Sequence, residues 1–384
     1  MAGTAELPVD PLDVLRRRSS AKWRTYPGDV LPLTVAEMDY PLAEPIAAVL
    51  HDAVDRSDTG YAMPPPDLGT ALARFAGQRW GWEIDPAAVT SVADVGVGMV
   101  QVLRVLTRPG DVIAISPPIY PPFFDWIPEA GARLLEVPLA HDADGWRLDL
   151  AALERAFATR PAVYLLCNPH NPVGRVHTPD ELAELVRLAR RYEVTVVSDE
   201  IHAPLVLPGA RFTPLLTVPG AADVALSLLS ASKAWNLAGL KCAAVVTASP
   251  KPAAAVDRFA PDARWRTGHF GVLASVAAFT EGTPWLDRLL ATLDRRRAQL
   301  GELLATRLPA VRWHPSQATF LAWLDCSAIG PDDEPRDLFL DKGRVALEPG
   351  TRFGTPGGGH VRLNFATSAD ILDQAVAQLA KATQ

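Results

Sequence analysis

One lysine of this chain stands where it could act as a nucleophile. Only six lysines occur among the 384 residues, and most lie near a terminus or in a polar loop. Lys233 differs, because it follows the apolar run at residues 224–229 and comes directly after Ser230 and Ser232. A lysine held out of water can lose its proton and attack an aldehyde, and serine hydroxyls suit a phosphate. An ordinary surface lysine after a strand is the alternative that this segment leaves open.

Two further polar segments follow apolar runs that we interpret as buried strands. Asp199 ends the run at residues 194–198, where a buried carboxylate is costly unless it meets a cation such as a protonated ring nitrogen. The structural alternative is an aspartate that caps the next helix or pairs with His202. Asn171 lies in residues 168–175, where two Asn-Pro steps and a glycine predict a rigid turn. A side chain fixed there could donate a hydrogen bond to a phenolate oxygen.

Glycines mark a fourth segment, residues 95–99, just before a helix that we predict to begin near Val100. A glycine-bearing turn into a helix offers backbone N–H groups and the positive end of the helix dipole to a phosphate. The segment is not a dinucleotide fingerprint, because Gln101 stands where the third glycine would fall. Neither a His-x-x-x-His motif nor paired cysteines accompany these segments, so the sequence predicts no metal site.

The elements that must position these residues alternate along the chain. Short apolar runs bounded by Pro, Gly, Asp or Asn predict buried strands at residues 112–116, 162–167, 194–198, 224–229 and 242–247. Helices are predicted at residues 68–80, 100–107 and 179–192, the last with Thr178 as N-cap and Glu181 completing a capping box. This alternation predicts a largely parallel sheet covered on both faces, with ligands at the carboxyl ends of its strands.

The pattern changes after residue 284. A long amphipathic helix at residues 284–307 leads to predicted strands at residues 319–324 and 361–365, which indicates a smaller α+β domain. We therefore expect an α/β protein with two domains. The predicted divisions are an arm at residues 1–48 that helps to form the small domain, a large domain at residues 49–284, and a small C-terminal domain at residues 285–384.

Composition narrows the classes of partner. The net charge is −7 and no basic stripe stands out, which argues against nucleic acid. Arg295, Arg296 and Arg297 are expected to form a solvated helix face. Three scattered cysteines are too few for a disulfide framework, so we expect free, buried thiols and a reducing cytoplasm. Neither a signal-peptide core nor an apolar run long enough to span a bilayer is found, so no membrane partner is expected.

In order and spacing, these segments resemble the pyridoxal 5′-phosphate (PLP)-dependent aminotransferase class I/II superfamily of fold type I. Within it, the chain looks most like the cystathionine β-lyase-type C–S lyases. The resemblance runs from residues 35–40 to the C-terminal domain and is specific in the combination of Ser-x-Ser-Lys at 230–233, Asp-Glu-Ile-His at 199–202 and Asn-Pro-His-Asn-Pro-x-Gly at 168–174. It implies a large domain with a mostly parallel sheet between helices, beside the smaller α+β domain.

The resemblance also implies roles for single residues. Lys233 would hold PLP as an imine and later move the Cα proton, and Asp199 would pair with the pyridine nitrogen. Asn171 would bind the phenolate oxygen, and Tyr120 would stack on the ring. Arg362 would grip the substrate α-carboxylate. The substrate site would also include Ala36 and Asn171, and the phosphate would be held by Ser230, Ser232, Lys241 and the backbone of Gly96, Val97, Gly98 and Met99.

Two further residues are implied at the edge of this site. Tyr61 would reach the phosphate of the neighbouring subunit, so that the active unit is a homodimer with shared active sites. His202 would help to position Asp199 or line the cofactor pocket, with a purely structural role as the alternative.

The activity implied by the resemblance is cleavage of cystathionine or another cysteine S-conjugate, a small amino-acid substrate, to a thiol, pyruvate and ammonia. An aminotransferase is the alternative, because the two reactions share every residue named above and diverge only after Cα deprotonation. A related PLP reaction and a regulator with a decayed site are the remaining candidates. The complete set of Lys233, Asp199, Asn171 and Arg362 speaks against decay.

Overall fold

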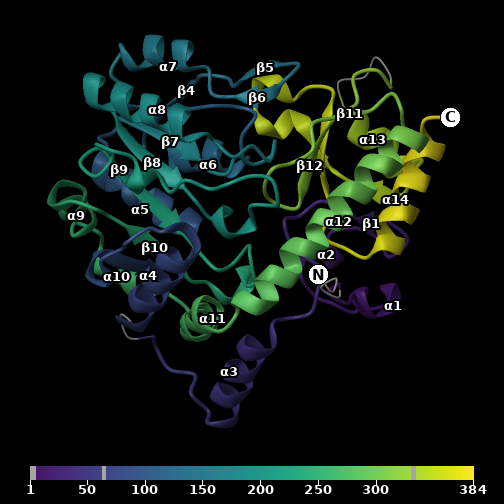
Figure 1. Ribbon diagram of the computed structural model, residues 1–384, viewed down its shortest axis with the longest axis horizontal. Coiled ribbons are helices and arrows are strands. Elements are labelled where there is room, and N and C mark those ends of the chain that lie inside the picture. The colour runs from purple at the N-terminus through teal and green to yellow at the C-terminus, as the bar shows by residue number, and fades with distance from the viewer. Residues whose placement is uncertain (1–5, 63–65, 330–333) are drawn as a thin grey trace.

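Two sheets organise the chain in the computed structural model, which describes residues 6–62, 66–329 and 334–384 (Figure 1). The larger sheet has seven strands in the order β2-β10-β9-β8-β7-β3-β4. These strands are β2 (Val89–Val92), β3 (Val112–Ile115), β4 (Arg133–Glu136), β7 (Val163–Cys167), β8 (Thr195–Asp199), β9 (Ala225–Leu229) and β10 (Ala243–Val246). The strands from β4 to β9 run parallel, and β10 is antiparallel to both of its neighbours.

The five predicted strands are confirmed as β3, β7, β8, β9 and β10, and the α/β class with a mostly parallel sheet is confirmed with them. The sequence prediction missed β2 and β4, the two edge strands. An edge strand is covered less completely than a central one, and β4 is half exposed with the sequence Arg-Leu-Leu-Glu. Its apolar run is therefore too short to be recognised.

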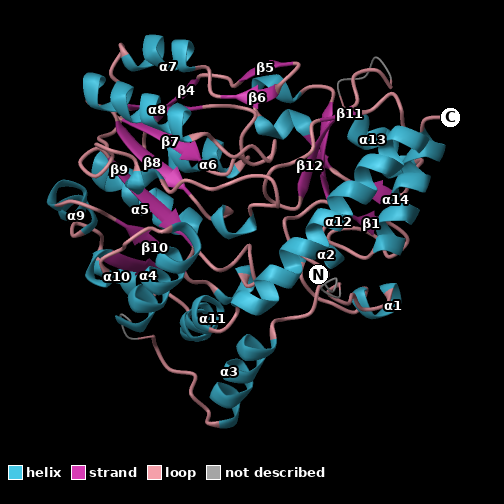
Figure 2. Cartoon of the chain, viewed as in Figure 1, coloured by secondary structure: helices cyan, strands magenta, loops and turns pink. Residues whose placement is uncertain are grey.

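Helices cover both faces of this sheet, as Figure 2 shows. On one face, Ile113 and Val197 pack with residues of α5 (Val95–Leu106) and α6 (Pro122–Glu129). On the other face, Tyr164 and Val196 pack with residues of α7 (Leu150–Phe157) and α8 (Pro179–Tyr192). Because alternate strand residues enter the two cores, every residue of β7 and β9 is buried.

Helix α8 has the predicted start. The Thr178 side chain accepts from the Glu181 N–H at 3.1 Å, and the Glu181 carboxylate accepts from the Thr178 N–H at 2.7 Å. Two of the donors left free at the helix start are satisfied in this way.

Helix α5 begins at Val95, so the predicted start near Val100 is wrong. Asp94 caps it by accepting from the Val97 N–H at 2.7 Å, which places the glycine segment in the first turns of the helix. A Cβ on Gly96 would lie 3.1 Å from the Trp126 ring, and one on Gly98 would lie 2.8 Å from Val92. Close packing, not a turn, therefore requires these glycines.

The smaller sheet has four antiparallel strands in the order β11-β12-β15-β14. These strands are β11 (Arg312–Trp313), β12 (Leu321–Asp325), β14 (Glu348–Pro349) and β15 (His360–Asn364), with α13 (Pro335–Asp341) and α14 (Ala369–Ala382) beside them. The predicted strands at residues 319–324 and 361–365 correspond to β12 and β15. Helix α12 (Thr283–Arg307) runs diagonally past both sheets in Figure 1 and confirms the predicted long helix.

The N-terminal residues contribute little regular structure, as expected, but they cross to the C-terminal part. Strand β1 (Leu31–Pro32) pairs in parallel with β13 (Val345–Ala346). The other elements of this region are α1 (Leu12–Leu15), α2 (Ala21–Arg24) and α3 (Glu44–Asp55), the last of which projects from the body in Figure 1. The pairing supports the arm as part of the small domain, while the domain limits stay predictions.

The remaining α-helices are α4 (Pro66–Trp80), which confirms the predicted helix at residues 68–80, α9 (Pro250–Val256), α10 (Pro261–Trp265) and α11 (His269–Thr280). The remaining strands, β5 (Ala140–Asp142) and β6 (Gly145–Arg147), form a hairpin. Residues 63–65, with the first two prolines of the Pro-Pro-Pro run, lie outside the described residues. Within the described parts of the chain, none of the helices is both long and apolar enough to cross a membrane.

Two expectations from composition can be compared with the structure. The three cysteines are free and buried, as predicted. The arginine run on α12 does not form a solvated face: the Arg296 side chain is 7% exposed and pairs with Glu6 at 2.8 Å. Arg297 donates to the Ser316 carbonyl at 2.8 Å. The N-terminal residues cover this side of α12, a tertiary contact that the sequence pattern does not reveal.

Candidate active site

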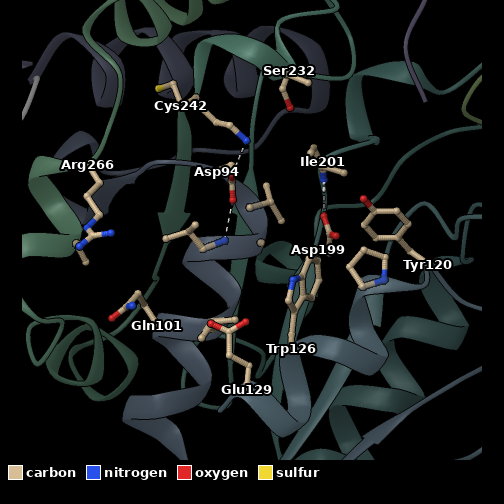
Figure 3. Close-up of a pocket in the computed structure, with 18 of the residues that line it drawn as sticks. Asp94, Gln101, Tyr120, Trp126, Glu129, Asp199, Ile201, Ser232, Cys242 and Arg266 are labelled. Atoms are coloured by element: carbon tan, nitrogen blue, oxygen red, sulfur yellow. Dashed lines mark hydrogen bonds and ion pairs between the residues drawn. The ribbon is translucent and has the colours of Figure 1, made fainter. Parts of the chain in front are cut away.

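A cavity of about 930 Å³ opens at the carboxyl ends of the central strands. Its wall includes Asp199 at the end of β8, Ser232 and Lys233 after β9, Tyr120 after β3, and the first turn of α5. Figure 3 shows the cavity extending from Asp199 and Tyr120 toward Gln101 and Arg266. The cavity thus lies where the sequence predicts the ligand site, at the carboxyl ends of the strands.

Lys233 has the environment of an activated amine. Its Nζ donates to the Ala36 carbonyl at 3.0 Å. Burial and the nearby Arg362 guanidinium lower the pKa of Lys233 to about 8. The other buried lysine, Lys22, differs, because its Nζ lies 2.8 Å from the Asp39 carboxylate and both side chains are 1% exposed. Lys22 thus has a carboxylate partner, whereas no ion pair to Lys233 is found in the described residues.

Asp199 faces the cavity as a buried carboxyl without a cation. Its Oδ1 accepts from the Ile201 N–H at 3.1 Å, an interaction drawn in Figure 3. Burial raises the pKa of Asp199 to about 6, with Lys233 opposing the shift. Within the described chain, no basic side chain forms an ion pair with Asp199. A protonated ring nitrogen would complete this site.

His202 lies on the same wall and is 3% exposed. Its Nδ1 has no hydrogen-bond partner among the described residues. Burial lowers the pKa of His202 to about 3, so the imidazole is neutral. The structure places His202 in the cavity and gives it no contact with Asp199 among the described hydrogen bonds, which favours the pocket-lining role over the positioning role.

Asn171, in the turn after β7 of the larger sheet, contacts Arg362, which lies on β15 of the smaller sheet. Arg362 Nη1 donates to Asn171 Oδ1 at 3.1 Å, and the guanidinium carbon lies 5.0 Å from the centre of the Phe353 ring. Both side chains are buried, and Arg362 Nε has no partner in the described residues. Asn171 lines the cavity, whereas Arg362 is not among the residues that line it and is linked to it through Asn171. Since the amide oxygen points at Arg362, the Asn171 amide N–H group is the one left to donate.

Tyr120 forms the side of the cavity nearest Asp199 in Figure 3. Its ring packs edge-on to Trp126 with centres 6.0 Å apart. Burial is the main cause that raises the pKa of Tyr120, so the side chain is a neutral phenol. Trp126 also lines the cavity and is a wall residue that sequence reasoning missed, because α6 gives no polar signal there.

The other end of the cavity collects the expected phosphate donors in part. Ser232, Gly96 and Val97 line it, together with Lys241, whose Nζ lies 2.9 Å from the Asp94 carboxylate. The Val97 N–H is already bound to Asp94, so the free N–H groups of the first helical turn are those of Val95 and Gly96. Asp94 directly before the glycine segment was the signal that could have identified this helix start.

Three other residues predicted for the phosphate lie away from the cavity surface. The Ser230 hydroxyl donates to the Cys242 carbonyl at 2.7 Å and accepts from the Ser232 N–H. Gly98 packs against Val92, its N–H donates to the Asp94 carbonyl, and Met99 is fully buried. These three residues pack beneath the cavity surface and do not line it.

Tyr61 lies apart from the cavity of its own chain. Its side chain is 85% exposed and packs edge-on to Trp265 with ring centres 6.4 Å apart. The single chain therefore leaves Tyr61 available to another molecule.

A clamp on the N-terminal arm was also missed by sequence reasoning. Asn236 exchanges two hydrogen bonds with the Met38 backbone, at 2.9 and 3.0 Å. Asn364 Nδ2 donates to the carbonyls of Val35 and Glu37, each at 2.7 Å. These side chains fix Ala36 beside Lys233, and no local pattern links residues so far apart in the sequence.

The residues present fit pyridoxal phosphate. Among the described residues, Asp199 has no cationic partner and the Asn171 amide N–H group has no acceptor, and Lys233 has a lowered pKa. An aldehyde-bearing pyridine ring uses these three groups at once, with its nitrogen at Asp199 and its ring oxygen at Asn171. Lys241, Ser232 and the start of α5 would hold its phosphate.

Comparison with known proteins agrees with this donor set. The family model described as aminotransferase class I and II matches residues 28–379. The chain is 46% identical to a Mycobacterium leprae protein provisionally named cystathionine beta-lyase, over 98% of both chains. It is 33% identical to the Bacillus subtilis cystathionine beta-lyase, over 91% of this chain and 92% of the relative.

A solved structure shows the same fold. The crystal structure of a protein from Corynebacterium diphtheriae, provisionally described as a PLP-dependent beta-cystathionase, superposes with a TM-score of 0.93 at 34% identity. The match covers 98% of this chain and 99% of that chain.

Proposed function

The chain belongs to the aminotransferase class I and II family, and from that premise we propose that it is a PLP-dependent C–S β-lyase. The substrate is cystathionine or another cysteine S-conjugate, and the products are a thiol, pyruvate and ammonia. The similarity to relatives named as cystathionine beta-lyases, over at least 91% of each chain, supports C–S cleavage.

One structural observation carries the PLP chemistry of the proposal, which the lyase and the aminotransferase share. Lys233 and Asp199 face one cavity, the first with a pKa lowered to about 8 and the second as a buried carboxyl that forms no ion pair with the described residues. A structural lysine or aspartate would pair with a neighbour, as Lys22 and Asp39 do at 2.8 Å. Perturbed groups that share a cavity mark a reactive site.

The chain's own groups divide the work between the two ends of the substrate. Arg362 would bind the α-carboxylate with its planar, charged guanidinium, whose Nε has no hydrogen-bond partner in the described residues. The Lys233 amine, near the substrate Cα, would take and return a proton. PLP, when bound, supplies the electron sink for the bond pair released at Cα. The Tyr120 ring and the buried wall exclude water from that position.

The deciding assay supplies the purified holoenzyme with cystathionine and several cysteine S-conjugates and follows thiol, pyruvate and ammonia. We expect equal amounts of the three products, and none from Lys233→Ala. If a 2-keto acid acceptor is converted to its amino acid without release of thiol, the protein is an aminotransferase and the proposal fails.

We also propose that the working unit is a homodimer in the cytoplasm. The apolar side chains of Val54, Tyr61 and Trp265 are 57, 85 and 51% exposed, and Val54 and Tyr61 lie on or just after the projecting helix α3. A second copy would cover them and receive Tyr61 near its phosphate site. Three free, buried cysteines support a reducing compartment.

A further inference from the structure

His170 is a buried histidine beside the active site that has no role in the proposed chemistry. It lies in the turn after β7, is 1% exposed, and its Nε2 lies 2.9 Å from the Pro118 carbonyl oxygen. Since a carbonyl oxygen only accepts, Nε2 must carry the proton and donate it. Burial lowers the pKa of His170 to about 3, so the ring is a fixed neutral donor and not a proton carrier.

The Pro118 carbonyl belongs to the loop that carries Tyr120. The same loop also contacts the segment between β14 and β15 of the smaller sheet. The Ile119 N–H donates to the Phe353 carbonyl at 2.9 Å. The Arg362 guanidinium lies over the Phe353 ring. The loop therefore connects the turn of His170 with Phe353, the ring on which the Arg362 guanidinium packs.

The contacts close into a ring beside the cavity, which Asn171 and Tyr120 line. Arg362 Nη1 donates to Asn171 Oδ1 at 3.1 Å, and Asn171 directly follows His170 in the chain. Within this ring, the bond from His170 to Pro118 is the side-chain contact that ties the turn carrying Asn171 to the loop carrying Tyr120. If it is lost, the amide of Asn171 and the phenol of Tyr120 are free to shift relative to each other, and Arg362 loses a fixed acceptor.

We propose that His170 is a positioning residue that holds Asn171, Tyr120 and Arg362 in one geometry through its Nε2–H bond to the Pro118 carbonyl. This inference rests on the proposed function, because it assumes that Asn171 faces the PLP ring oxygen and Arg362 the substrate carboxylate. A shift of about 1 Å in such groups is enough to lower reactivity by an order of magnitude or more.

The chain offers a matched control in His177. It is also fully buried, its Nε2 lies 3.0 Å from the Cys167 carbonyl, and its ring centre lies 5.7 Å from that of His170. Burial lowers the pKa of His177 to about 4. Its bond stays within the β7–α8 connection and does not reach the loop of Tyr120.

The experiment compares His170→Phe, His170→Gln and His177→Phe as holoenzymes. For His170→Phe we expect KM for the amino-acid substrate to rise roughly tenfold or more, with a smaller change in kcat. The pH midpoint of the absorption change of Lys233-bound PLP should also move upward, because a loosened Asn171 withdraws less charge from the ring oxygen. His170→Gln keeps an N–H donor, so its KM and absorption midpoint should return most of the way to the wild-type values. His177→Phe should lower Tm and leave KM and the midpoint unchanged.

Equal loss of Tm in the two Phe variants, with KM and the absorption midpoint unchanged, would show a merely structural histidine and overturn the inference. Should His170→Phe not fold, nitrogen-15 NMR of the histidine rings in the wild-type protein decides. We expect a neutral Nε2–H ring for His170 from pH 5 to 9, and titration or an Nδ1–H tautomer refutes the bond. Failure of the proposed lyase activity is recognised separately, because the absorption midpoint and ring NMR do not depend on thiol release.

Discussion

At the scale of single residues, this site depends on Asp199 and Lys233, two ionisable groups that have no ion-pair partner within the described parts of the chain. Burial of Asp199 without a cation and lowering of the Lys233 pKa both destabilise the charged forms of these groups. Lys22 and Asp39 show the opposite solution, a buried pair in which each charge neutralises the other. The fold thus holds groups ready for a ligand at the expense of its own stability.

Asp199 gives this trade-off a measurable sign. Its pKa is about 6 in the folded protein, above the ordinary value of 3.8, so ionising it destabilises the fold as the pH rises from about 4 through 6. Asp199→Asn, which keeps an acceptor for the Ile201 N–H, should therefore stabilise the apoprotein at pH 7.5 by about 2–3 kcal/mol. Urea unfolding should show a smaller gain at pH 5, and activity should fall. A gain that is absent at pH 7.5 would mean that another group compensates the buried charge.

Arg362 separates substrate binding from folding. Arg362→Ala should leave PLP bound to Lys233 and lower kcat/KM. The fall should correspond to a loss of about 2–5 kcal/mol of transition-state stabilisation, the range for a buried charged contact that loses its partner. Arg362→Lys should recover little, because an ammonium group cannot reproduce the planar fork. Melting temperature, PLP occupancy and kcat/KM are measured on one preparation. A loss of Tm and occupancy with near-normal kcat/KM would make Arg362 a structural arginine.

At the scale of elements, the start of α5 determines what the phosphate end of the cavity can offer. Asp94 both caps the helix and pairs with Lys241. By binding the Val97 N–H, it leaves the N–H groups of Val95 and Gly96 for an anion. Gly96 lets Trp126 approach the helix closely, and Gly98 does the same for Val92 of β2. The start of α5 and the aromatic side chains of Trp126 and Tyr120 therefore line the same cavity.

Loss of the Asp94 cap should lower the stability of the protein even when no cofactor is bound. Asp94→Ala removes the acceptor for the Val97 N–H and should lower the free energy of unfolding of the apoprotein by about 1 kcal/mol. Asp94→Asn keeps an acceptor and should lose only a few tenths of that amount. Chemical denaturation of both apoproteins checks the difference. Equal loss in the two variants would indicate that the ion pair with Lys241, not the cap, stabilises the helix start.

At the scale of the whole molecule, the exposed aromatic and apolar side chains near α3 require an explanation. Tyr61 is 85% exposed and does not reach its own cavity, so a role at a phosphate requires a second subunit. Large exposed apolar side chains such as Tyr61 and Trp265, whose ring centres lie 6.4 Å apart, are typical of an interface.

Subunit exchange tests the shared site. In a hybrid of Tyr61→Phe and Lys233→Ala subunits, one site receives both native side chains and the other receives neither. Mixed dimers should therefore recover up to about half of the activity of the wild-type dimer, although the Lys233→Ala parent is inactive. Sedimentation checks the assembly state of each mixture. A fully active monomer, or mixtures whose activity only averages that of the parents, would exclude Tyr61 from the partner's site.

The sequence by itself determined the parts of this protein that local chemistry encodes. Alternating apolar runs and helix caps identified five central strands, α8 and α12, and the polar segments at the strand ends identified Lys233, Asp199 and Asn171. Parallel strands bring their carboxyl ends to one edge, so order along the chain already implied that these residues meet.

Only the tertiary structure decided the rest. Helix α5 starts earlier than its glycines suggested, because packing against Trp126 and Val92 favours glycine inside a capped helix. The contact between Arg362 and Asn171 joins residues 191 positions apart, and the Asn236 bonds to Met38 join residues 198 apart. Such contacts follow from how two sheets and an arm fit together, and that fit depends on shape and burial across the whole fold, which no local pattern records.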